Sequence, residues 1–532
     1  MGGLVDDLMN IARHPIIDDF APTIAGIIPA NRQRGLIRCG RSILTTALLI
    51  GSAGSACALD AYIVGPRALG MGGTGVASTN DQTAQFYNPA LFGFFGRTTG
   101  PDNQDLAKKD WGFGLDASAG VRVHGDLPEL VEVLGKLDIQ RLRANGIQTP
   151  EDLHSVVVAA KALNDLLASS NAVSADANAG VSVRIGHAAL GVRAYGQAAT
   201  LVSGTDLVNV ALQVGGAALA NQINGANSPT DNQVALLSNT QRDSLYSALG
   251  GAGAFNAGSQ AGQAVQRIDY QMRQTGMTGA QVDTTVTVLQ NAATNAGQGL
   301  DENDTVMRVR GFGLAEVPLS YGWAIDDHWS VGGSLKLMIG RVAGAQVSVF
   351  KDGALESLES APDNAQTTVN WGVDLALAGR WQYIQAGIIG RNLNSPKFDG
   401  FTNDFNGQPQ VVEDVRIDPQ VAVGVAFIPW TWLTVALDAD LLPGEASFSG
   451  YDTQRIGAGL EVNPWDVLAL RIGIYKNIAE SDIGPVATLG AGLNLWALRI
   501  DLALAASLER TEISGYHVPD EMRGAFSLAV DF

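Results

Sequence analysis

The sequence predicts an all-β protein, a closed antiparallel transmembrane β-barrel of about 14 strands with helical loop insertions. Three observations indicate this fold. Apolar and polar residues alternate along many short segments, the connections between segments are alternately short and long, and most of the 9 tryptophans lie near one end of the segments. No apolar run after the N-terminal region approaches the ~20 residues that a membrane helix needs. A membrane protein of this kind has to be a closed barrel, because open sheet edges cannot lie in lipid.

The segment 521–532 shows the alternation most simply. Its even positions, from Met522 to Phe532, are apolar or glycine, whereas its odd positions are polar or small. Successive side chains of a strand point to opposite faces, so one face is apolar. A strand of a soluble sandwich could show the same pattern. The length, however, matches the ~9–11 residues of a membrane strand. The terminal Phe532 resembles the insertion signal of outer-membrane barrels, so barrel assembly machinery is an expected partner.

The other strands are predicted from the same period of two. They are expected at 111–124, 175–186, 188–202, 308–325, 329–350, 366–380, 382–393, 412–428, 431–441, 453–463, 466–475, 485–495 and 497–510. An arginine facing lipid at the midplane would cost about 2–4 kcal/mol, so the faces that carry arginine should face the lumen. Because buried charges need partners, we expect a ladder of paired charges there. Its predicted members are Arg455, Glu461, Arg471, Arg499, Asp501 and Arg523, with Glu509 a further candidate carboxylate.

The predicted connections support a barrel with its short turns on the periplasmic side. Short turns are expected at 186–187, 326–328, 380–381, 429–430, 463–465 and 496. The tryptophans at or near these turns, or at the same end of the first strand, are Trp111, Trp323, Trp329, Trp381, Trp430, Trp432, Trp465 and Trp496. Aromatic residues collect at membrane interfaces because they combine an apolar body with a polar edge. Only Trp371 does not fit this pattern.

Composition excludes several classes of function. The net charge of −19 argues against nucleic acid as a partner, because nucleic-acid binding requires a basic face. Both cysteines, Cys39 and Cys57, precede the predicted mature chain, which excludes cysteine metal sites and thiol chemistry there. No GxSxG or HExxH motif is present, and the histidines are scattered. We therefore expect neither an enzyme nor a cofactor.

Residues 1–58 are predicted to be an N-terminal extension and signal peptide. Arginines precede an apolar run at 43–53, and small residues follow it. Ala56 and Ala58 fit the small-x-small pattern, so cleavage is expected after Ala58. A lipoprotein signal at Cys57 is the weaker alternative, because Gly54 lies where a bulky aliphatic residue is expected.

The next region, 59–110, carries a specific pattern. The run Gly65-Pro-Arg-Ala-Leu-Gly-Met-Gly-Gly-Thr-Gly-Val-Ala is followed by Asn88-Pro-Ala. Its GxGxxG match to a dinucleotide fingerprint is discounted, because no βαβ unit surrounds it. The two motifs resemble the mature N-terminus of FadL-type outer-membrane transporters, in which this region forms a hatch inside the barrel. The resemblance implies a hatch and substrate site at Gly70, Gly72, Gly73, Gly75, Asn88, Pro89 and Ala90. The alternative is that the glycines only form turns beside the first strand.

The barrel is expected to span 111–532, interrupted by insertions at 126–174 and 203–307. Within 126–170 the apolar residues have helical spacing. Residues 205–305 are rich in Ala, Gln, Asn, Gly and Ser, which predicts amphipathic helices or partly disordered loops.

A second resemblance covers the C-terminal half. The segments Asn394-Ser-Pro-Lys-Phe, Arg416-Ile-Asp-Pro-Gln and Ala469-Leu-Arg-Ile-Gly-Ile-Tyr-Lys-Asn resemble the TraF-like conjugal-transfer family of predicted outer-membrane proteins. This resemblance implies that the chain is a member of the TraF-like family and that it forms a barrel in contact with outer-membrane lipid. The FadL resemblance implies passive uptake of small hydrophobic molecules through a hatch-gated lumen, with Asn88 holding the hatch to the wall. The alternative is a structural or surface-interaction barrel associated with conjugal plasmid transfer.

Overall fold

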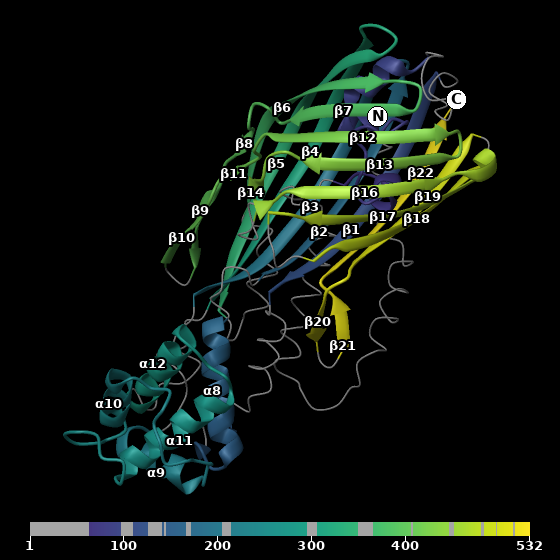
Figure 1. Ribbon diagram of the computed structural model, residues 1–532. Coiled ribbons are helices and arrows are strands. Elements are labelled where there is room, and N and C mark those ends of the chain that lie inside the picture. Colours follow the sequence, from purple (N-terminus) through teal and green to yellow (C-terminus); the bar gives the residue numbers. More distant parts are fainter. Residues whose placement is uncertain are drawn as a thin grey trace, which may run out of the picture. The chain divides into compact units, whose positions relative to one another are not determined.

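The structure is a computed structural model in which a closed barrel of 14 antiparallel strands is the main feature (Figure 1). It describes residues 63–96, 110–125, 141–142, 145–165, 172–204, 214–294, 306–348, 365–405, 408–445, 452–479, 484–495, 497–513 and 516–531. The predicted signal region 1–58 and the predicted insertion signal Phe532 lie outside the described residues.

The barrel closes because its first strand pairs with its last. The wall strands, in order around the barrel, are β1 (Trp111–His124), β2 (Ala172–Ile185), β3 (Ala188–Gly204), β4 (Val306–Ala324), β5 (Trp329–Ser348), β6 (Ala365–Arg380), β7 (Ile384–Arg391), β12 (Gln420–Trp430), β13 (Leu433–Asp440), β16 (Arg455–Val462), β17 (Leu468–Asn477), β18 (Val486–Leu495), β19 (Leu498–Ser507) and β22 (Glu521–Asp531). Closure joins Gly112 of β1 to Asp531 of β22. The prediction of a 14-strand antiparallel barrel is confirmed.

Side chains alternate between the two faces of the wall as predicted. On β19, Leu502 and Leu504 are 57% and 70% exposed and face outward, whereas Asp501 is buried and faces the lumen. The described tryptophans near the short turns are exposed, whereas Trp496 and its predicted turn lie outside the described residues. Trp329 and Trp381 meet edge to face at 5.3 Å between ring centroids. Trp371 also faces outward, and nine residues separate it from Arg380 at the short-turn end of β6. At a rise of ~3.3 Å and the usual tilt, Trp371 lies roughly 22 Å away, near the opposite interface.

One predicted strand was wrong at its start. The expected strand 412–428 begins only at Gln420, directly after Pro419, which has no N–H to donate to a ladder. The preceding residues form two-stranded ribbons outside the barrel sheet instead. The ribbon strands of the chain are β8 (Lys397–Phe398), β9 (Phe401–Phe405), β10 (Gln408–Val412), β11 (Val415–Arg416), β14 (Gly444–Glu445), β15 (Asp452–Thr453), β20 (Arg510–Ile513) and β21 (Tyr516–Pro519).

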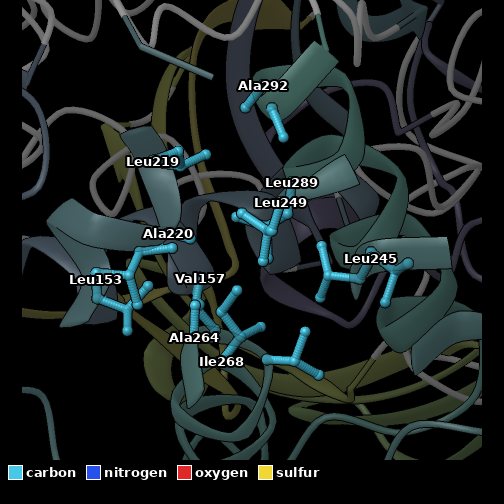
Figure 2. Packing of buried hydrophobic residues seen from close by; sticks show 14 of the residues in the cluster. Leu153, Val157, Leu219, Ala220, Leu245, Leu249, Ala264, Ile268, Leu289 and Ala292 are labelled. Carbon is cyan, nitrogen blue, oxygen red and sulfur yellow. The ribbon is translucent and has the colours of Figure 1, made fainter. Parts of the chain in front are cut away.

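The described residues between β1 and β2 and between β3 and β4 include five helices, and the flanking strands reach slightly into the predicted insertions. The helices are α8 (Pro150–Asp165), α9 (Gly216–Gly225), α10 (Asn239–Ala248), α11 (Gln260–Gln274) and α12 (Ala280–Thr294). Figure 2 shows that Leu153 and Val157 of α8 belong to the same apolar core as Leu219 and Ile268 of α9 and α11. Two insertions far apart in sequence therefore build one core. Among the described residues, no helix is long and apolar enough to cross a bilayer.

Leu335 provides a test of the lipid-facing wall. It is 56% exposed on β5, six residues from Trp329 and thus roughly 15 Å into the apolar band. We expect Leu335→Arg to lower the free energy of unfolding in lipid vesicles by about 2–4 kcal/mol, because the charge would lie in hydrocarbon. The control Val411→Arg changes a residue that is 68% exposed on a ribbon strand and should have little effect. Equal stabilities in a urea titration would contradict a membrane-facing wall.

Candidate functional site

The lumen is occupied by residues 63–96, called here the N-terminal segment. It contains α4 (Pro66–Gly70), α5 (Ala84–Tyr87) and the 3-10 helix η2 (Pro89–Phe94). Leu69 and Phe86 of this segment pack in one buried cluster with Tyr475 and Val486 of the wall. Leu69, Asn88 and Phe92 are each 0% exposed. The inward face of the barrel thus packs against the N-terminal segment in place of solvent.

Internal hydrogen bonds fix the shape of the segment. Burial raises the pKa of Tyr87 to about 12, so its hydroxyl stays protonated at neutral pH. That hydroxyl accepts a hydrogen bond from the Val64 amide at 2.7 Å and donates one to the Val64 carbonyl at 3.1 Å. Residues 64 and 87 are therefore held together, and the segment forms a compact loop.

The four predicted glycines lie where the segment meets the wall or itself most closely. Gly72 and Gly73 have φ angles of +67° and +76°, which favour glycine. A Cβ on Gly72 would also lie 2.4 Å from the Ala458 carbonyl oxygen, and one on Gly75 would lie 2.4 Å from the Tyr87 ring. A Cβ on Gly70 would lie 3.0 Å from the Cα atom of Gly490 of β18. At Gly70 and Gly72 the backbone of the segment therefore packs directly against the backbone of the wall.

The wall supplies matching glycines, which the sequence analysis missed. A Cβ on Gly457, Gly459 or Gly473 would come within 2.1–2.3 Å of backbone atoms of residues 71 and 72. These glycines occupy inward positions of β16 and β17, so the wall is hollowed where the segment turns. The signal in the sequence was glycine at alternate positions on adjacent strands, but nothing there indicates what fills the space.

Asn88, Pro89 and Ala90 lie against β5 and β6. The Asn88 amide donates to the carbonyl of Val76 at 3.0 Å and to the wall carbonyl of Leu377 at 3.3 Å, and its oxygen accepts from the Ala90 amide. Asn88 thereby caps η2, and Pro89 occupies the first position of that helix. The Ala90 carbonyl accepts from Ser330 of β5 at 2.6 Å. Asn88 and the Ala90 carbonyl thus both join the segment to the wall.

Four members of the predicted charge ladder form one continuous chain on the wall. Arg471 donates to Glu461 and to Asp501, both at 2.6 Å, and Arg499 pairs with Asp501 at 3.1 Å. Both ends of this chain terminate on the N-terminal segment. Arg67 pairs with Glu461 at 2.7 Å, and Asp81 pairs with Arg499. Removing one partner of such a buried pair typically costs about 3–5 kcal/mol.

The other predicted ladder members and Glu509 lie apart from this chain. Arg523 pairs with Asp176 of β2 at 2.5 Å and belongs to a second group that includes Glu521. Arg455 packs beside Gly73. Glu509 is exposed, because β19 ends at Ser507 and the residue lies in the following turn. The alternation of β16 to β22 predicted which arginines face inward, but the partners depend on strand register.

Several residues that hold the segment were not predicted. Asp438 of β13 accepts hydrogen bonds from the amides of Gly75 and Val76 at 2.7 and 2.8 Å. Thr488 of β18 accepts from the Gly72 amide and donates to a carbonyl at residue 70, each at 3.1 Å. Arg391 of β7 donates to the Phe86 carbonyl at 3.1 Å. Each is a polar residue at an inward strand position, but its partner is a backbone group that sequence patterns do not reveal.

Aromatic residues of the segment also stack on wall arginines. The guanidinium groups of Arg184, Arg193 and Arg380 lie 4.0, 4.4 and 5.3 Å from the ring centroids of Phe95, Phe86 and Phe94 respectively. A cation over an aromatic face in a desolvated site contributes about 2 kcal/mol. The segment is therefore held by charge, hydrogen-bond and ring contacts around much of the wall.

A buried apolar cluster lies farther from the short-turn end of the strands, on the inward faces of β3, β4 and β5. Wall residues Tyr195, Phe312 and Met338 pack there against Phe398 of the loop between β7 and β12. The Phe312 and Phe398 ring centroids are 5.2 Å apart. A Cβ on Gly340 would lie 2.2 Å from the Phe398 ring, so the wall is hollowed for this side chain. The loop thus inserts an aromatic residue into the lumen.

Comparison with solved structures finds barrels of similar length. They include the Ralstonia pickettii toluene transporter TbuX, with 13% identity, TM-score 0.42 and coverage of 88% of this chain and 98% of that chain. The P. putida toluene transporter TodX has 12% identity, TM-score 0.41 and coverage of 89% and 99%. A Pseudomonas aeruginosa FadL homologue has 10% identity, TM-score 0.40 and coverage of 90% and 99%. Because each score is below 0.5, we base the fold on this chain's own strand pairing.

Comparison of the sequence with curated proteins finds no match. Comparison with protein families finds one over residues 85–440, two-thirds of the chain, which include part of the N-terminal segment, the helical insertion and the wall from β1 to β13. The predicted TraF-like membership is confirmed: the chain belongs to the TraF_2 family, described as "F plasmid transfer operon, TraF, protein".

Proposed function

We propose that this chain is an outer-membrane barrel through which small hydrophobic molecules pass passively, with the N-terminal segment as a hatch. The observation that carries the proposal is the occupied lumen: residues 63–96 fill the barrel without belonging to its wall. A barrel of this size would otherwise contain a water-filled channel. A removable filling supports controlled passage, and its resemblance to the FadL-type hatch points to hydrophobic substrates.

The arrangement of charges would let the hatch move while the four charges of the wall chain stay paired with one another. Glu461 pairs with Arg67 of the hatch but also with Arg471 of the wall. Arg499 pairs with Asp81 of the hatch but also with Asp501. If the hatch shifts, both wall groups keep a partner, which avoids the large cost of an isolated buried charge. Arg67 and Asp81 would move toward water, where they are solvated.

The apolar cluster around Phe398 would form the second part of the path. A molecule entering from the loop side would meet buried aromatic and aliphatic side chains of β3 to β5 before it reached the hatch. Pockets for small ligands are mostly apolar, with a few polar groups that fix orientation. Here Tyr195 donates to Glu316 at 2.9 Å and provides such a polar group. The substrate class that fits this surface is a small hydrophobic molecule.

Asn88 tests the hatch. Asn88→Ala removes the bonds to Val76, Leu377 and Ala90 and leaves buried backbone groups unsatisfied, at about 1–3 kcal/mol each. We expect a several-fold faster uptake of a small hydrophobic dye by liposomes that contain the variant. Asn224→Ala, which removes a half-buried amide of α9 that donates to Gln260 of α11, should behave as the unchanged protein. Equal flux from all three proteins would count against a hatch held by Asn88.

Phe398 tests the apolar path. Phe398→Ala would vacate the space between Phe312 and Gly340, so uptake of a hydrophobic dye should rise several-fold while a polar dye of similar size should respond little. Val411→Ala, an exposed residue of the same loop, is the control. An equal increase for both dyes would indicate general leakage and would contradict an apolar path.

A second candidate function rests on the helical core. α8 and α9 to α12 come from two insertions yet share one apolar core, as expected of a folded recognition module. Family membership makes a role in conjugal plasmid transfer the corresponding alternative. In that case the helices would contact a partner cell or secretion machinery, and uptake would be incidental.

Removing both insertions together distinguishes the two functions, because deleting one alone would expose the core shared with the other. We expect the barrel without 126–170 and 205–304 to remain folded, as judged by different gel mobility of boiled and unboiled samples. Under the uptake function its dye flux is retained, and plasmid transfer between cells is unchanged. Lost transfer with retained flux would instead support the recognition function.

A further inference from the structure

A hollow of about 810 Å³ lies on the outward face of the wall, over β18, β19, β22, β1, β2 and β3. Along each strand, the residues that line the hollow alternate between outward and inward positions, and the outward side chains face it. Ala119 and Val121 of β1 share the outward face with Leu115, whereas Gly120 between them contributes only backbone. The same holds on β2, where Ala175 and Ala177 flank inward-facing Asp176. The hollow is therefore separate from the lumen and its hatch.

Strand register shows how the hollow is built. One row of outward positions crosses the strands as neighbouring pairs, in the order Leu489, Leu504, Gly524, Ala119, Ala177 and Gly196. The next row toward the long loops is Ala487, Ala506, Met522, Val121, Ala175 and Ala198. Glycine and alanine form the floor, and the leucines and the methionine form one rim. The missing side chains leave the space.

The small outward positions continue for one more row toward the short turns, at Ala117, Ala179 and Ala194, and larger residues follow. Four residues closer to the short turns, Leu115 pairs with Val181, which pairs with Val192, and all three are at least 37% exposed. The small floor is thus local and is not a general property of this quarter of the wall. Its volume falls within the about 300–1,000 Å³ typical of pockets for small ligands.

The hollow lies near the far boundary of the apolar band. Ala119 and Val121 are eight and ten residues beyond Trp111, which corresponds to roughly 20–25 Å along the membrane normal in a band about 25 Å tall. Arg341 of β5 lies twelve residues beyond Trp329, or roughly 30 Å, and is exposed. It pairs with Gly313 of β4, which pairs with Gly196 of the floor. A cation therefore lies at headgroup depth, two strands from the hollow.

We propose that this hollow binds the acyl chains of one membrane lipid whose anionic phosphate headgroup lies at Arg341. Small residues let an apolar partner approach the backbone closely, and in a bilayer close packing rather than the hydrophobic effect drives such contacts. Arginine recognises phosphate through charge and paired N–H donors. The apolar acyl chains would pack on the glycine and alanine floor within the apolar band. The negative phosphate would lie beside the positive Arg341 at headgroup depth.

The size of the hollow disfavours a second copy of the chain as its occupant. It is about five strand spacings wide and three residues high, or roughly 250 Å². A stable protein interface needs about 800 Å² from each partner. A long, narrow occupant such as an acyl chain fits this footprint better than another barrel does.

Native mass spectrometry of the full chain in detergent tests the proposal, with phosphatidylglycerol or phosphatidylcholine added in turn. The unchanged protein should retain one phosphatidylglycerol, at least tenfold more than phosphatidylcholine. Ala119→Leu with Ala177→Leu fills the floor with outward apolar side chains and should lower phosphatidylglycerol retention at least tenfold. The control pair Ala386→Leu and Ala439→Leu makes the same change at outward positions of β7 and β13 and should retain lipid normally.

Arg341→Gln separates the headgroup from the acyl chains. It leaves the floor intact and should remove the preference for phosphatidylglycerol, so the two lipids are retained equally. This variant also keeps the test decisive if the filled floor does not fold. Four results would overturn the proposal. The unchanged and filled proteins could retain phosphatidylglycerol equally, or the control pair could lose it to the same extent. Arg341→Gln could keep the lipid preference, or the unchanged protein could form a dimer that filling the floor abolishes.

Discussion

A barrel of 14 strands needs something inside it, and this constraint shapes most of the structure. Closure gives every wall strand a hydrogen-bonded neighbour on both sides but leaves an inward face of polar and small side chains. In this chain the buried row Glu461, Arg471, Asp501 and Arg499 meets that need by ending on Arg67 and Asp81 of the N-terminal segment. The N-terminal segment supplies ion-pair partners to charges of the wall, and the wall in turn holds the segment in its folded shape.

The charge chain on the wall has a partner from each source at both ends. Glu461 pairs with Arg471 of the wall and with Arg67 of the segment, and Arg499 pairs with Asp501 of the wall and with Asp81 of the segment. Close backbone packing at Gly72 and Gly459 and the ring contacts of Phe86, Phe94 and Phe95 add steric precision. The segment therefore fits the wall closely, and the wall members of the charge chain also pair with one another.

Most of the fold could be predicted from the sequence because a lipid-facing wall imposes a simple rule on every strand. Period-two alternation, turn lengths and interfacial tryptophans depend on local sequence, so strands such as 111–124 and 521–531 were placed within a residue or so. The error at 412–428 arose where Val412 and Val415 are apolar for another reason, since they pack with or near Phe398 in the loop.

The site was less predictable because its contacts join residues far apart in the chain. The inward direction of Arg471 and Arg499 followed from the cost of charge in lipid, but Asp81 as the partner of Arg499 depends on a separation of 418 residues. Asp438 and Thr488 bind backbone amides, for which no side-chain pattern exists. The outer hollow depends on register across six strands and could not be seen from any single strand.

The helical core shared by the two insertions has a mechanical consequence. Because α8 follows β1 while α9 to α12 follow β3, a single folded body ties the far ends of the hairpins β1–β2 and β3–β4. Three of these strands, β1, β2 and β3, carry part of the glycine and alanine floor, where interlocking between neighbouring side chains is weakest. The helices would then act as a clamp that prevents this quarter of the cylinder from splaying apart.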